Sequence, residues 1–422
     1  MDKLKVGIAG YGIVGKRRHF YINSHPNLKV KAICDRSFQN NGKLDNGIIY
    51  FRNYKELFDE PLDILFVCLT NDVAAEVTIA GLEKGLHVFC EKPPGRNLQE
   101  IRPKTIFDEY LKLAKQDCLI YFKDSENTTI NCPACDQQGE YAFRKDNFNY
   151  ANCSHCETLY VNPRPSIENF FQYYKESESS KYWASTFYKK TAEARYEKIW
   201  KPKARIIKNT LLNYDALNSI LIDIGSGYGV FAEAMRELTE QPMLLIEPAP
   251  HLAAICRTKG FSVIDKFLEE INPIDLDLVT ARKTFVCFEL FEHLHNPMKF
   301  LNVLNQLMNT NDLFIFTTLS STGLDIQVLW EHSKAVSPPH HLNFFNPSSI
   351  KLLLERTNFE VLEITTPGQL DIDILEKNQN QIQDRFWKTF INQASVSQKE
   401  KMQEIIAAQG FSSHMMIVCS KR

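Results

Sequence analysis

The chain has 422 residues, 44% hydrophobic and 24% charged, which is the composition of a globular protein with room for two or three domains. The formal net charge of −2 gives no electrostatic reason to expect nucleic acid or an anionic membrane as a partner. No apolar run approaches the ~20 residues that a membrane-spanning helix needs. The N-terminus shows no signal-peptide pattern, so we expect a cytoplasmic protein with its 11 cysteines reduced, apart from any that bind metal.

A glycine-rich turn follows the first predicted strand, LKVGIA. Gly10, Gly12 and Gly15 have the G-x-G-x-x-G spacing, which permits a tight turn and lets the backbone approach a pyrophosphate at the start of a helix. Asp35 closes the second predicted strand, 20 residues after Gly15, where a ribose-binding carboxylate is expected. The pattern predicts NAD binding, and Arg36 beside Asp35 leaves NADP open. The alternative is a glycine-rich turn with a surface aspartate.

Apolar runs and helical segments continue to alternate after this point, which predicts a doubly wound parallel sheet. The predicted strands are 47–51, 62–70, 86–94 and 118–123, with helices at 72–84 and 97–116. The stretch VFCEKPPG, together with the glycine turn, resembles the glucose–fructose oxidoreductase and inositol dehydrogenase family over about residues 1–125. The resemblance implies that Lys92 lies beside the nicotinamide as a catalytic residue. The family's second domain, which supplies a catalytic histidine, has no counterpart here, so Lys92 is alternatively a lysine in a structural turn.

Four cysteines follow with the spacing C-x2-C, seventeen residues, C-x2-C: Cys132, Cys135, Cys153 and Cys156. Each C-x2-C places two thiolates on one tight knuckle, and two knuckles complete a tetrahedron around Zn²⁺. Four protein ligands close the coordination shell, so the expected zinc is structural. The alternative is a set of buried or redox-active thiols. The segment between the knuckles has only Arg144 and Lys145 as basic residues, which does not favour a phosphate-binding face.

A second glycine-rich loop occurs in ILIDIGSGYG, residues 220–229. It resembles the first motif of class I S-adenosylmethionine (SAM) methyltransferases. The resemblance implies that Asp223 lies near the ammonium group of SAM, with the backbone of Gly225, Gly227 and Gly229 beneath its methionine part. Glu247 ends the next predicted strand and would accept the ribose hydroxyls. A dinucleotide-binding loop is the competing interpretation, but the acid before the glycines favours SAM.

The remaining segments fit the same fold. Predicted strands lie within 275–289 and at 312–319, followed by a closing antiparallel pair at 359–368 and 412–421. The helical insert 369–410 is expected to act as a lid or as a homodimer surface. The four cysteines, NPRP, the SAM motif and HHLNFF (340–345) together resemble zinc-containing sugar C-methyltransferases over about residues 130–368, although their large C-terminal domain is missing here.

That resemblance implies His341 as the base at the sugar. His293, in a segment that resembles the EHL-x-x-P stretch of SAM methyltransferases, is the second candidate, because a neutral histidine suits proton removal near pH 7. Both are alternatively structural histidines. Tyr160 and Tyr173 would line the acceptor pocket or pack at a domain junction.

We therefore predict an α/β protein with two doubly wound Rossmann-like domains joined by a small zinc ribbon of four cysteines. The expected domains are 1–126 for NAD(P), 127–165 for zinc and 166–422 for SAM. The predicted activity is methyl transfer to a sugar nucleotide or related glycan precursor in polysaccharide biosynthesis, with no nucleic-acid or membrane partner. The alternatives are a bifunctional sugar oxidoreductase and methyltransferase, and a non-enzymatic scaffold that senses cofactors.

Overall fold

The computed structural model describes residues 3–69, 71–90, 103–276 and 281–422. The chain divides into two compact units, Met1–Glu100 and Ile101–Arg422. The predicted catalytic Lys92 lies outside the described residues. Each unit has its own sheets and is described by itself.

The N-terminal unit is an open α/β sheet. Its elements are β1 (Leu4–Ala9), α1 (Ile13–Ser24), β2 (Leu28–Cys34), β3 (Gly42–Lys43), β4 (Ile49–Phe51), α2 (Tyr54–Leu57), β5 (Ile64–Val67), α3 (Asn71–Glu83) and β6 (His87–Cys90). The strand order is β3-β4-β2-β1-β5-β6, and every pair is parallel except β3 with β4. This order confirms the predicted parallel sheet of the first domain.

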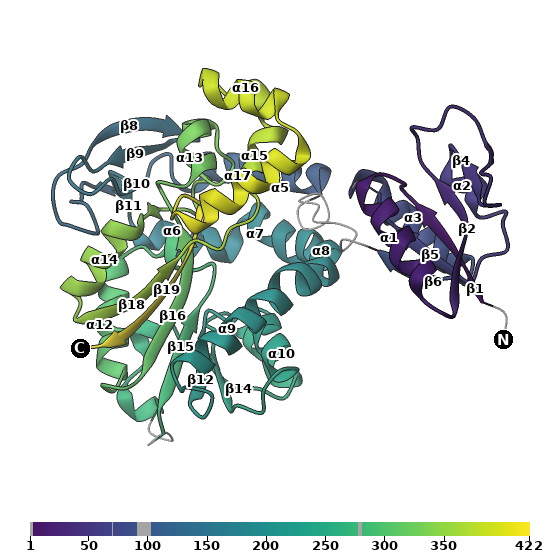
Figure 1. Cartoon of the computed structure of the whole chain (residues 1–422). Helices are drawn as coiled ribbons and strands as arrows, with labels where there is room; N and C mark the ends of the chain where they lie inside the picture. The colour runs from purple at the N-terminus through teal and green to yellow at the C-terminus, as the bar shows by residue number, and fades with distance from the viewer. Residues whose placement is uncertain (1–2, 70, 91–102, 277–280) are drawn as a thin grey trace. The chain divides into compact units, whose positions relative to one another are not determined.

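Helices cover both faces of this sheet (Figure 1). Ile8 of β1 packs with Ile22 of α1, whereas the next residue, Ala9, packs on the other side with Val77 of α3. Side chains alternate between the faces of a strand, so consecutive apolar residues in β1 serve two separate cores. This two-sided burial explains why the strands are continuous apolar runs in the sequence.

The predicted sixth strand at 118–123 is wrong. Residues 118–121 are the last turn of α5 (Lys104–Tyr121), which belongs to the C-terminal unit and packs against α6 and α7 there. The buried positions are Tyr110, Ala114, Cys118 and Phe122, four residues apart, whereas Ile120 is exposed. This spacing is that of one helix face. The apolar run had the composition of a strand, but its burial follows the helical period.

The C-terminal unit contains the remaining elements. After α5 come β7 (Asn127–Thr128), β8 (Glu140–Lys145), β9 (Phe148–Asn152), β10 (Leu159–Val161), β11 (Arg164–Pro165), α6 (Ile167–Glu176), α7 (Glu178–Tyr182), η1 (Trp183–Phe187), α8 (Tyr188–Arg195), η2 (Tyr196–Trp200), α9 (Lys201–Asn213), β12 (Ile220–Ile224), α10 (Val230–Arg236), β13 (Met243–Ile246), α11 (Pro250–Thr258) and β14 (Ser262–Ile264). These are followed by η3 (Leu268–Glu270), η4 (Pro273–Leu276), β15 (Lys283–Cys287), η5 (Phe291–His293), α12 (Pro297–Leu307), β16 (Leu313–Leu319), α13 (Leu324–Leu329), η6 (Trp330–His332), β17 (Asn343–Phe344), α14 (Pro347–Arg356), β18 (Phe359–Thr365), α15 (Asp371–Lys377), η7 (Gln379–Gln381), α16 (Arg385–Gln393), α17 (Val396–Ala408) and β19 (His414–Lys421).

The large sheet of this unit has the order β14-β13-β12-β15-β16-β19-β18. The first five strands are parallel, and β19 runs antiparallel between β16 and β18, which confirms the predicted closing pair. Helices α9 and α10 share a buried cluster with one face of the sheet, and α12 and α14 share one with the other. The insert 369–410 is helical as predicted, and α15 packs on α13.

The cysteine-containing segment is built into this unit rather than forming a body of its own. Its sheet has the order β17-β10-β9-β8. The edge strand β17 comes from residues 343–344, far from the cysteines in the sequence, and pairs with β10. Cys132, Cys153 and Cys156 share one buried cluster with Ile222 and Phe285 of the large sheet. The ribbon and the large sheet therefore have a continuous hydrophobic core.

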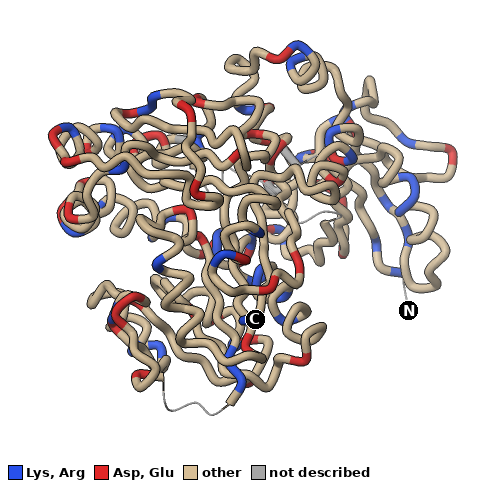
Figure 2. The backbone as a smooth tube through the Cα atoms, turned by 90° about the vertical axis from the view of Figure 1, so that its left-hand side faces the viewer, with Lys and Arg blue, Asp and Glu red and all other residues tan. Residues whose placement is uncertain are grey.

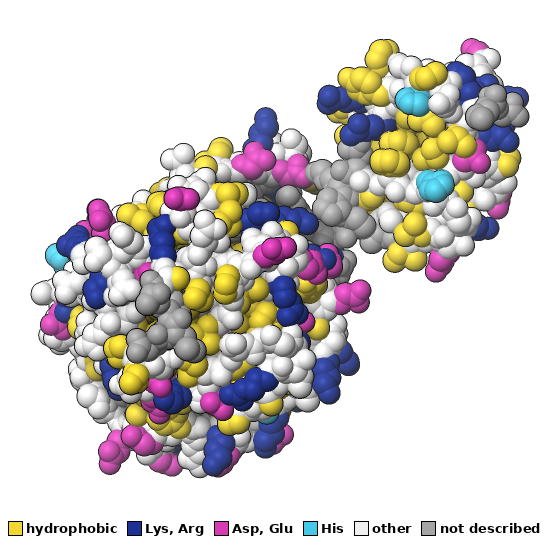
Figure 3. All heavy atoms as spheres, turned by 90° about the horizontal axis from the view of Figure 1, so that it is seen from below, with side chains coloured by type: hydrophobic (Ala, Val, Ile, Leu, Met, Phe, Trp, Pro, Cys, Tyr) yellow, Lys and Arg dark blue, Asp and Glu magenta, His cyan; other side chains and the backbone are white. Residues whose placement is uncertain are grey.

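The surfaces carry mixed charges and some exposed apolar groups. Basic and acidic residues are interspersed along the backbone (Figure 2). The N-terminal unit exposes Ile13, Phe20 and Phe89, and Figure 3 shows hydrophobic side chains gathered on the visible face of the smaller body. Among the described residues, no helix combines the length and apolarity that crossing a bilayer requires.

Arg164 provides a test of the join between ribbon and sheet. Its buried guanidinium donates to the carbonyl of His295 at 2.6 Å and to Oδ1 of Asn343 at 2.8 Å. Because Arg164→Leu removes the donor of both bonds and leaves the buried Oδ1 of Asn343 without it, we expect the free energy of unfolding to fall by about 2–4 kcal/mol in urea denaturation. The exposed Arg144→Leu should change it by about 0.5 kcal/mol or less. Equal stability of the two variants would contradict this description of the join.

Candidate active site and cysteine cluster

The glycine-rich loop after β12 has the geometry of a ligand cradle. Gly225, Gly227 and Gly229 all have positive φ, at 72°, 56° and 69°. A Cβ added to Gly227 would meet no heavy atom within 4 Å, so the loop opens onto space at this residue. The loop lies between the carboxyl end of β12 and the start of α10, the edge at which open α/β sheets bind ligands.

Asp223, near the end of β12, is the clearest unsatisfied group at this edge. Its side chain is 4% exposed, and Oδ2 has no hydrogen-bond partner among the described residues. Burial, reinforced by the nearby Glu247, raises the pKa of Asp223 to about 7, while Lys203 opposes the shift. A buried carboxylate without a partner is costly, so the site is complementary to a cationic ligand group.

Glu247, directly after β13, holds the loop in place. Its Oε2 accepts from the N–H of Gly227 at 2.7 Å, and its Oε1 accepts from the N–H of Ala249 at 2.9 Å. Burial raises the pKa of Glu247 despite these two bonds. Each carboxylate oxygen can accept a further bond, so a ribose diol could share them. Asp223, the open loop and Glu247 thus fit SAM, as the sequence predicts.

An ion pair that the sequence analysis missed borders Asp223, with Lys203 largely buried and Glu289 partly exposed. Nζ of Lys203 lies 2.9 Å from Oε1 of Glu289, and Nε2 of His414 lies 3.4 Å from the same oxygen. Burial would raise the pKa of Glu289, but Lys203 and His414 together hold it below its usual range. Glu289 lies shortly after β15, so the acid itself was visible in the sequence. Its partners come from α9 and from the start of β19, and only the fold brings them together.

Histidines gather at the end of the neighbouring strand. His293 ends η5, which follows β15, while His340 and His341 precede β17. The rings of His293 and His341 are 4.8 Å apart, and those of His293 and His340 are 6.0 Å apart. Both predicted catalytic histidines of this unit therefore lie in one cluster. Burial, with the adjacent His341 and His340, lowers the pKa of His293 well below its usual value, and burial lowers the pKa of His340 to about 3.

The proton on His341 is fixed by the backbone. Its Nδ1 lies 2.5 Å from the carbonyl oxygen of Ala335. A carbonyl only accepts, so Nδ1 carries the proton and Nε2 carries the lone pair when the ring is neutral. Two further backbone contacts hold this loop: the hydroxyl of Tyr150 donates to the His341 carbonyl at 3.0 Å, and the N–H of Leu342 donates to the Glu292 carbonyl at 2.9 Å.

Glu292 joins the histidine cluster and was also missed as a site residue. It is 2% exposed, and its Oε2 accepts from the hydroxyl of Thr318 at 3.3 Å. Burial and the neighbouring Glu289 raise the pKa of Glu292 to about 8. Glu292, His293 and His341 each offer one ligand atom, and the three atoms lie within 4.8 Å of one another.

The two tyrosines considered as pocket residues differ in their surroundings. Tyr173 hydrogen-bonds through its hydroxyl to Nε2 of His340 at 2.7 Å and to Ser179 at 2.8 Å, so it does reach the histidine cluster. Tyr160 is fully buried, and its hydroxyl accepts from the N–H of Gly139 at 3.2 Å within the ribbon. Tyr160 is therefore a packing residue, the second of the two roles considered for it.

The four predicted metal-binding cysteines converge. Their Sγ atoms lie within 4.8 Å of one another, with Cys132 3.5 Å from Cys156 and Cys135 3.5 Å from Cys153. Tetrahedral Zn–S bonds of about 2.3 Å place the sulfurs about 3.8 Å apart, so this thiol set fits zinc.

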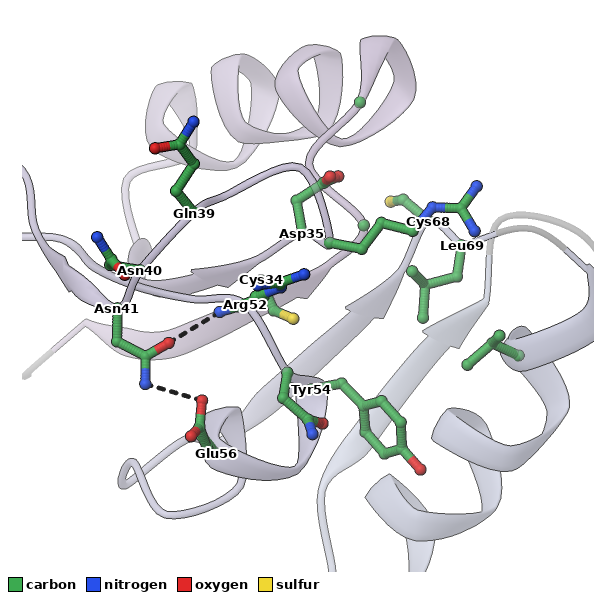
Figure 4. A pocket seen from close by; sticks show the side chains of 15 residues that line it. Cys34, Asp35, Gln39, Asn40, Asn41, Arg52, Tyr54, Glu56, Cys68 and Leu69 are labelled. Atoms are coloured by element: carbon green, nitrogen blue, oxygen red, sulfur yellow. Dashed lines mark hydrogen bonds between the residues drawn. The ribbon is translucent and has the colours of Figure 1, made fainter.

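The N-terminal unit has a cavity of about 740 Å³ at the carboxyl end of its strands. Gly10, Gly12, Asp35, Arg36 and Arg52 line it, and Figure 4 shows Asp35 and Arg52 among its walls. The Asp35 carboxylate accepts from the N–H of Tyr11 at 2.7 Å and of Ser37 at 2.9 Å. These bonds fix the carboxylate against the glycine turn, which fits a dinucleotide.

The third predicted glycine of this turn has a packing role. A Cβ on Gly15 would overlap the carbonyl of Gly10, so only glycine lets α1 lie this close to β1. The turn, the close helix and the acid at the end of β2 therefore all occur as the sequence predicts.

Comparisons with known proteins agree with this division. A family model described as an oxidoreductase family with an NAD-binding Rossmann fold matches residues 4–110, and a methyltransferase domain model matches residues 194–364. The oxidoreductase YrbE of Bacillus subtilis is 31% identical over 102 residues, which are 23% of this chain and 30% of that protein. D-glucoside 3-dehydrogenase of Escherichia coli is 31% identical over 104 residues, 24% of this chain and 30% of that protein. The chain thus spans about a third of the length of these relatives.

Solved methyltransferases share low identity with the chain. A SAM-dependent methyltransferase from Archaeoglobus fulgidus is 17% identical, covering 52% of this chain and 94% of its own, with a TM-score of 0.34. Magnesium protoporphyrin IX methyltransferase from Synechocystis is 10% identical, covering 53% and 83%, with a TM-score of 0.34. The domain assignments rest on the family models and the strand order rather than on these scores. The chain therefore joins an NAD-binding Rossmann domain of the oxidoreductase family to a methyltransferase domain.

Proposed function

We propose that the protein transfers the methyl group of SAM to a sugar nucleotide or a related glycan precursor used in polysaccharide biosynthesis. The observation that carries the proposal is the buried Oδ2 of Asp223, which no described residue hydrogen-bonds, beside an open glycine loop. Strand β15 is one of the two strands that pair with β12, and its carboxyl end leads to the histidine cluster. This common edge supports the proposal that the cofactor and the proton acceptor act together.

Each residue has a defined role in this proposal. SAM supplies a methyl group on a positively charged sulfur, which makes it a strong donor. Asp223 binds the ammonium group and Glu247 the ribose, so the chain's contribution is mainly alignment. His341 accepts the proton of the methyl acceptor at Nε2, because the Ala335 carbonyl keeps the proton on Nδ1. His293 lies against His341 and is neutral at pH 7 because its pKa is lowered.

The sugar acceptor is supported by two separate features. The cysteine ribbon joined to an HHLNFF loop resembles sugar C-methyltransferases, and here the two are physically linked through β10 and β17. The N-terminal domain resembles enzymes named for D-glucoside and inositol oxidation, whose substrates are polyhydroxylated rings. We propose in addition that the four cysteines bind a structural Zn²⁺ and that the N-terminal cavity binds NAD or NADP.

A methyl-transfer assay tests the main proposal. With labelled SAM and a panel of sugar nucleotides, we expect turnover by the full chain and its loss in Gly227→Arg, whose side chain fills the open space of the loop. His341→Gln should lower the rate by about 10²–10⁴-fold, the usual contribution of a general base. The exposed His332→Gln is the matched control and should keep full activity. SAM binding without methyl transfer to any glycan precursor would favour a cofactor-sensing scaffold.

The same assay separates a monofunctional from a bifunctional enzyme. Oxidation of a sugar to a ketone would acidify the adjacent carbon, so adding NAD⁺ or NADP⁺ should increase methylation only if the N-terminal domain is active. Gly12→Arg would then remove the increase, because Gly12 faces open space at the cavity. If neither dinucleotide nor Gly12→Arg changes the methylation rate, the C-terminal unit alone is responsible for the activity.

The raised pKa of Asp223 predicts how SAM binding depends on pH. Below about pH 7 the Asp223 carboxyl of the free protein is protonated and cannot pair with the ammonium group. SAM binding favours the ionised form, so affinity should rise up to tenfold per pH unit from about pH 5 to 7 and level off above. Titration calorimetry of wild type and Asp223→Asn measures this. If SAM affinity still depends weakly on pH in Asp223→Asn, the remaining dependence comes from Glu247. If the dependence is the same as in wild type, Asp223 is not the titrating group.

A further inference from the structure

Glu292, His293 and His341 form a second group of ligand atoms, separate from the four cysteines. One ligand atom from each lies within 4.8 Å of the other two. The three residues come from two segments, η5 and the loop before β17. A backbone hydrogen bond from Leu342 to Glu292, 2.9 Å long, joins these segments directly beside the ligand atoms. The cluster is therefore fixed by the fold rather than by a chance approach of long side chains.

The contacts behind these side chains are those of metal ligands. Metal-binding histidines usually donate their other ring N–H to a backbone carbonyl, and metal-binding carboxylates are themselves hydrogen-bonded. His341 donates from Nδ1 to the Ala335 carbonyl, and the His293 side chain has a hydrogen bond with the backbone of His340. Glu292 accepts from the Thr318 hydroxyl. Each of the three side chains thus has a hydrogen-bonding partner that can orient it.

Charge also favours a cation at this place. In the part of the chain that the structure describes, Glu292 is buried without an ion pair to lysine or arginine, whereas the adjacent Glu289 is paired with Lys203. A carboxylate taken out of water needs a compensating charge. The imidazoles of His293 and His341 add two neutral donors but no compensating positive charge.

We propose that Glu292, His293 and His341 bind a divalent transition-metal ion. Two imidazoles and one carboxylate suit Mn²⁺, Fe²⁺, Co²⁺ or Zn²⁺ and leave coordination positions open. In contrast, the four thiolates of the ribbon form a closed site. The inference rests on the proposed methyl transfer and deepens it. The open positions would take an oxygen of the hydroxylated acceptor, and the ion would lower the pKa of that hydroxyl so that its proton passes to solvent water. The oxygen then bonds to the methyl carbon as the carbon–sulfur bond of SAM breaks, which leaves S-adenosylhomocysteine. In this form of the proposal Nε2 of His341 is a metal ligand and not the base.

Mn²⁺ is the probe because it prefers oxygen and imidazole donors to thiolates. Metal analysis of the full chain loaded with one equivalent of Zn²⁺ and passed through gel filtration should give one Zn²⁺ per chain, held by the thiolates that Zn²⁺ prefers. Titration of this zinc-loaded protein with MnCl2, with free Mn²⁺ read by electron paramagnetic resonance, should then reveal one further site. Glu292→Gln and His341→Gln should each weaken Mn²⁺ binding at least about tenfold.

The chain provides a matched control. Glu331 and His332 are an adjacent, solvent-accessible Glu–His pair, with Nε2 of His332 3.9 Å from Oε1 of Glu331. The double variant E331Q/H332Q should bind Mn²⁺ like wild type. SAM titration of every variant separates loss of the metal site from loss of the fold.

The titration of the wild-type protein is the first test of the proposed metal site. Zinc-loaded wild type that binds no Mn²⁺, and no Co²⁺ in a parallel titration, overturns it. Unchanged Mn²⁺ affinity in Glu292→Gln also overturns it. Mn²⁺ binding by a protein that fails to bind SAM would support the metal site and contradict the proposed methyl transfer instead. Methyl transfer at full rate with the Mn²⁺ site empty would return the base role to His341 alone.

Discussion

The histidine loop, residues 340–342, is held by one short strand pairing, between β10 of the cysteine ribbon and β17. Leu159 pairs with Phe344 and Tyr160 with Asn343. The four cysteines bring the two knuckles of the ribbon together, β10 pairs with β17, and only Leu342 separates β17 from His341. Arg164 and Tyr150 reinforce the join by donating to buried acceptors around the loop. A structural metal in the ribbon would therefore act on catalysis indirectly, by holding the histidine loop in register with the large sheet.

The edge of the large sheet brings several carboxyl groups together in poorly solvated surroundings. Asp223 and Glu292 each have a raised pKa, whereas Glu289 between them is paired with Lys203. Buried acids that lack an ion-pair partner are costly, and perturbed pKa values of this kind are typical of functional sites. Asp223 adjoins the glycine loop after β12, and Glu292 belongs to the histidine cluster after β15. The proposal assigns the first end to the cofactor and the second to the methyl acceptor.

Local motifs were predictable from the sequence, and long-range partners were not. The glycine turns and the four cysteines depend on short fixed spacings, and Gly227, Asp223 and Cys132 lie where those spacings predict. Lys203 and Glu292 were missed because their roles arise from contacts across the fold. Helix α5 shows the same limit. Its last turn is as apolar as a strand, and only burial every fourth residue against the C-terminal unit reveals a helix.

The central claim is that one sheet edge holds SAM at the glycine loop and the methyl acceptor at the histidine cluster. A crystal structure of the protein grown with S-adenosylhomocysteine tests this most directly. We expect its ammonium group within hydrogen-bond distance of Asp223, its ribose at Glu247 and its sulfur directed toward His341. Density for the nucleoside only in the cavity of the N-terminal unit, or a sulfur directed away from the histidines, would contradict the account.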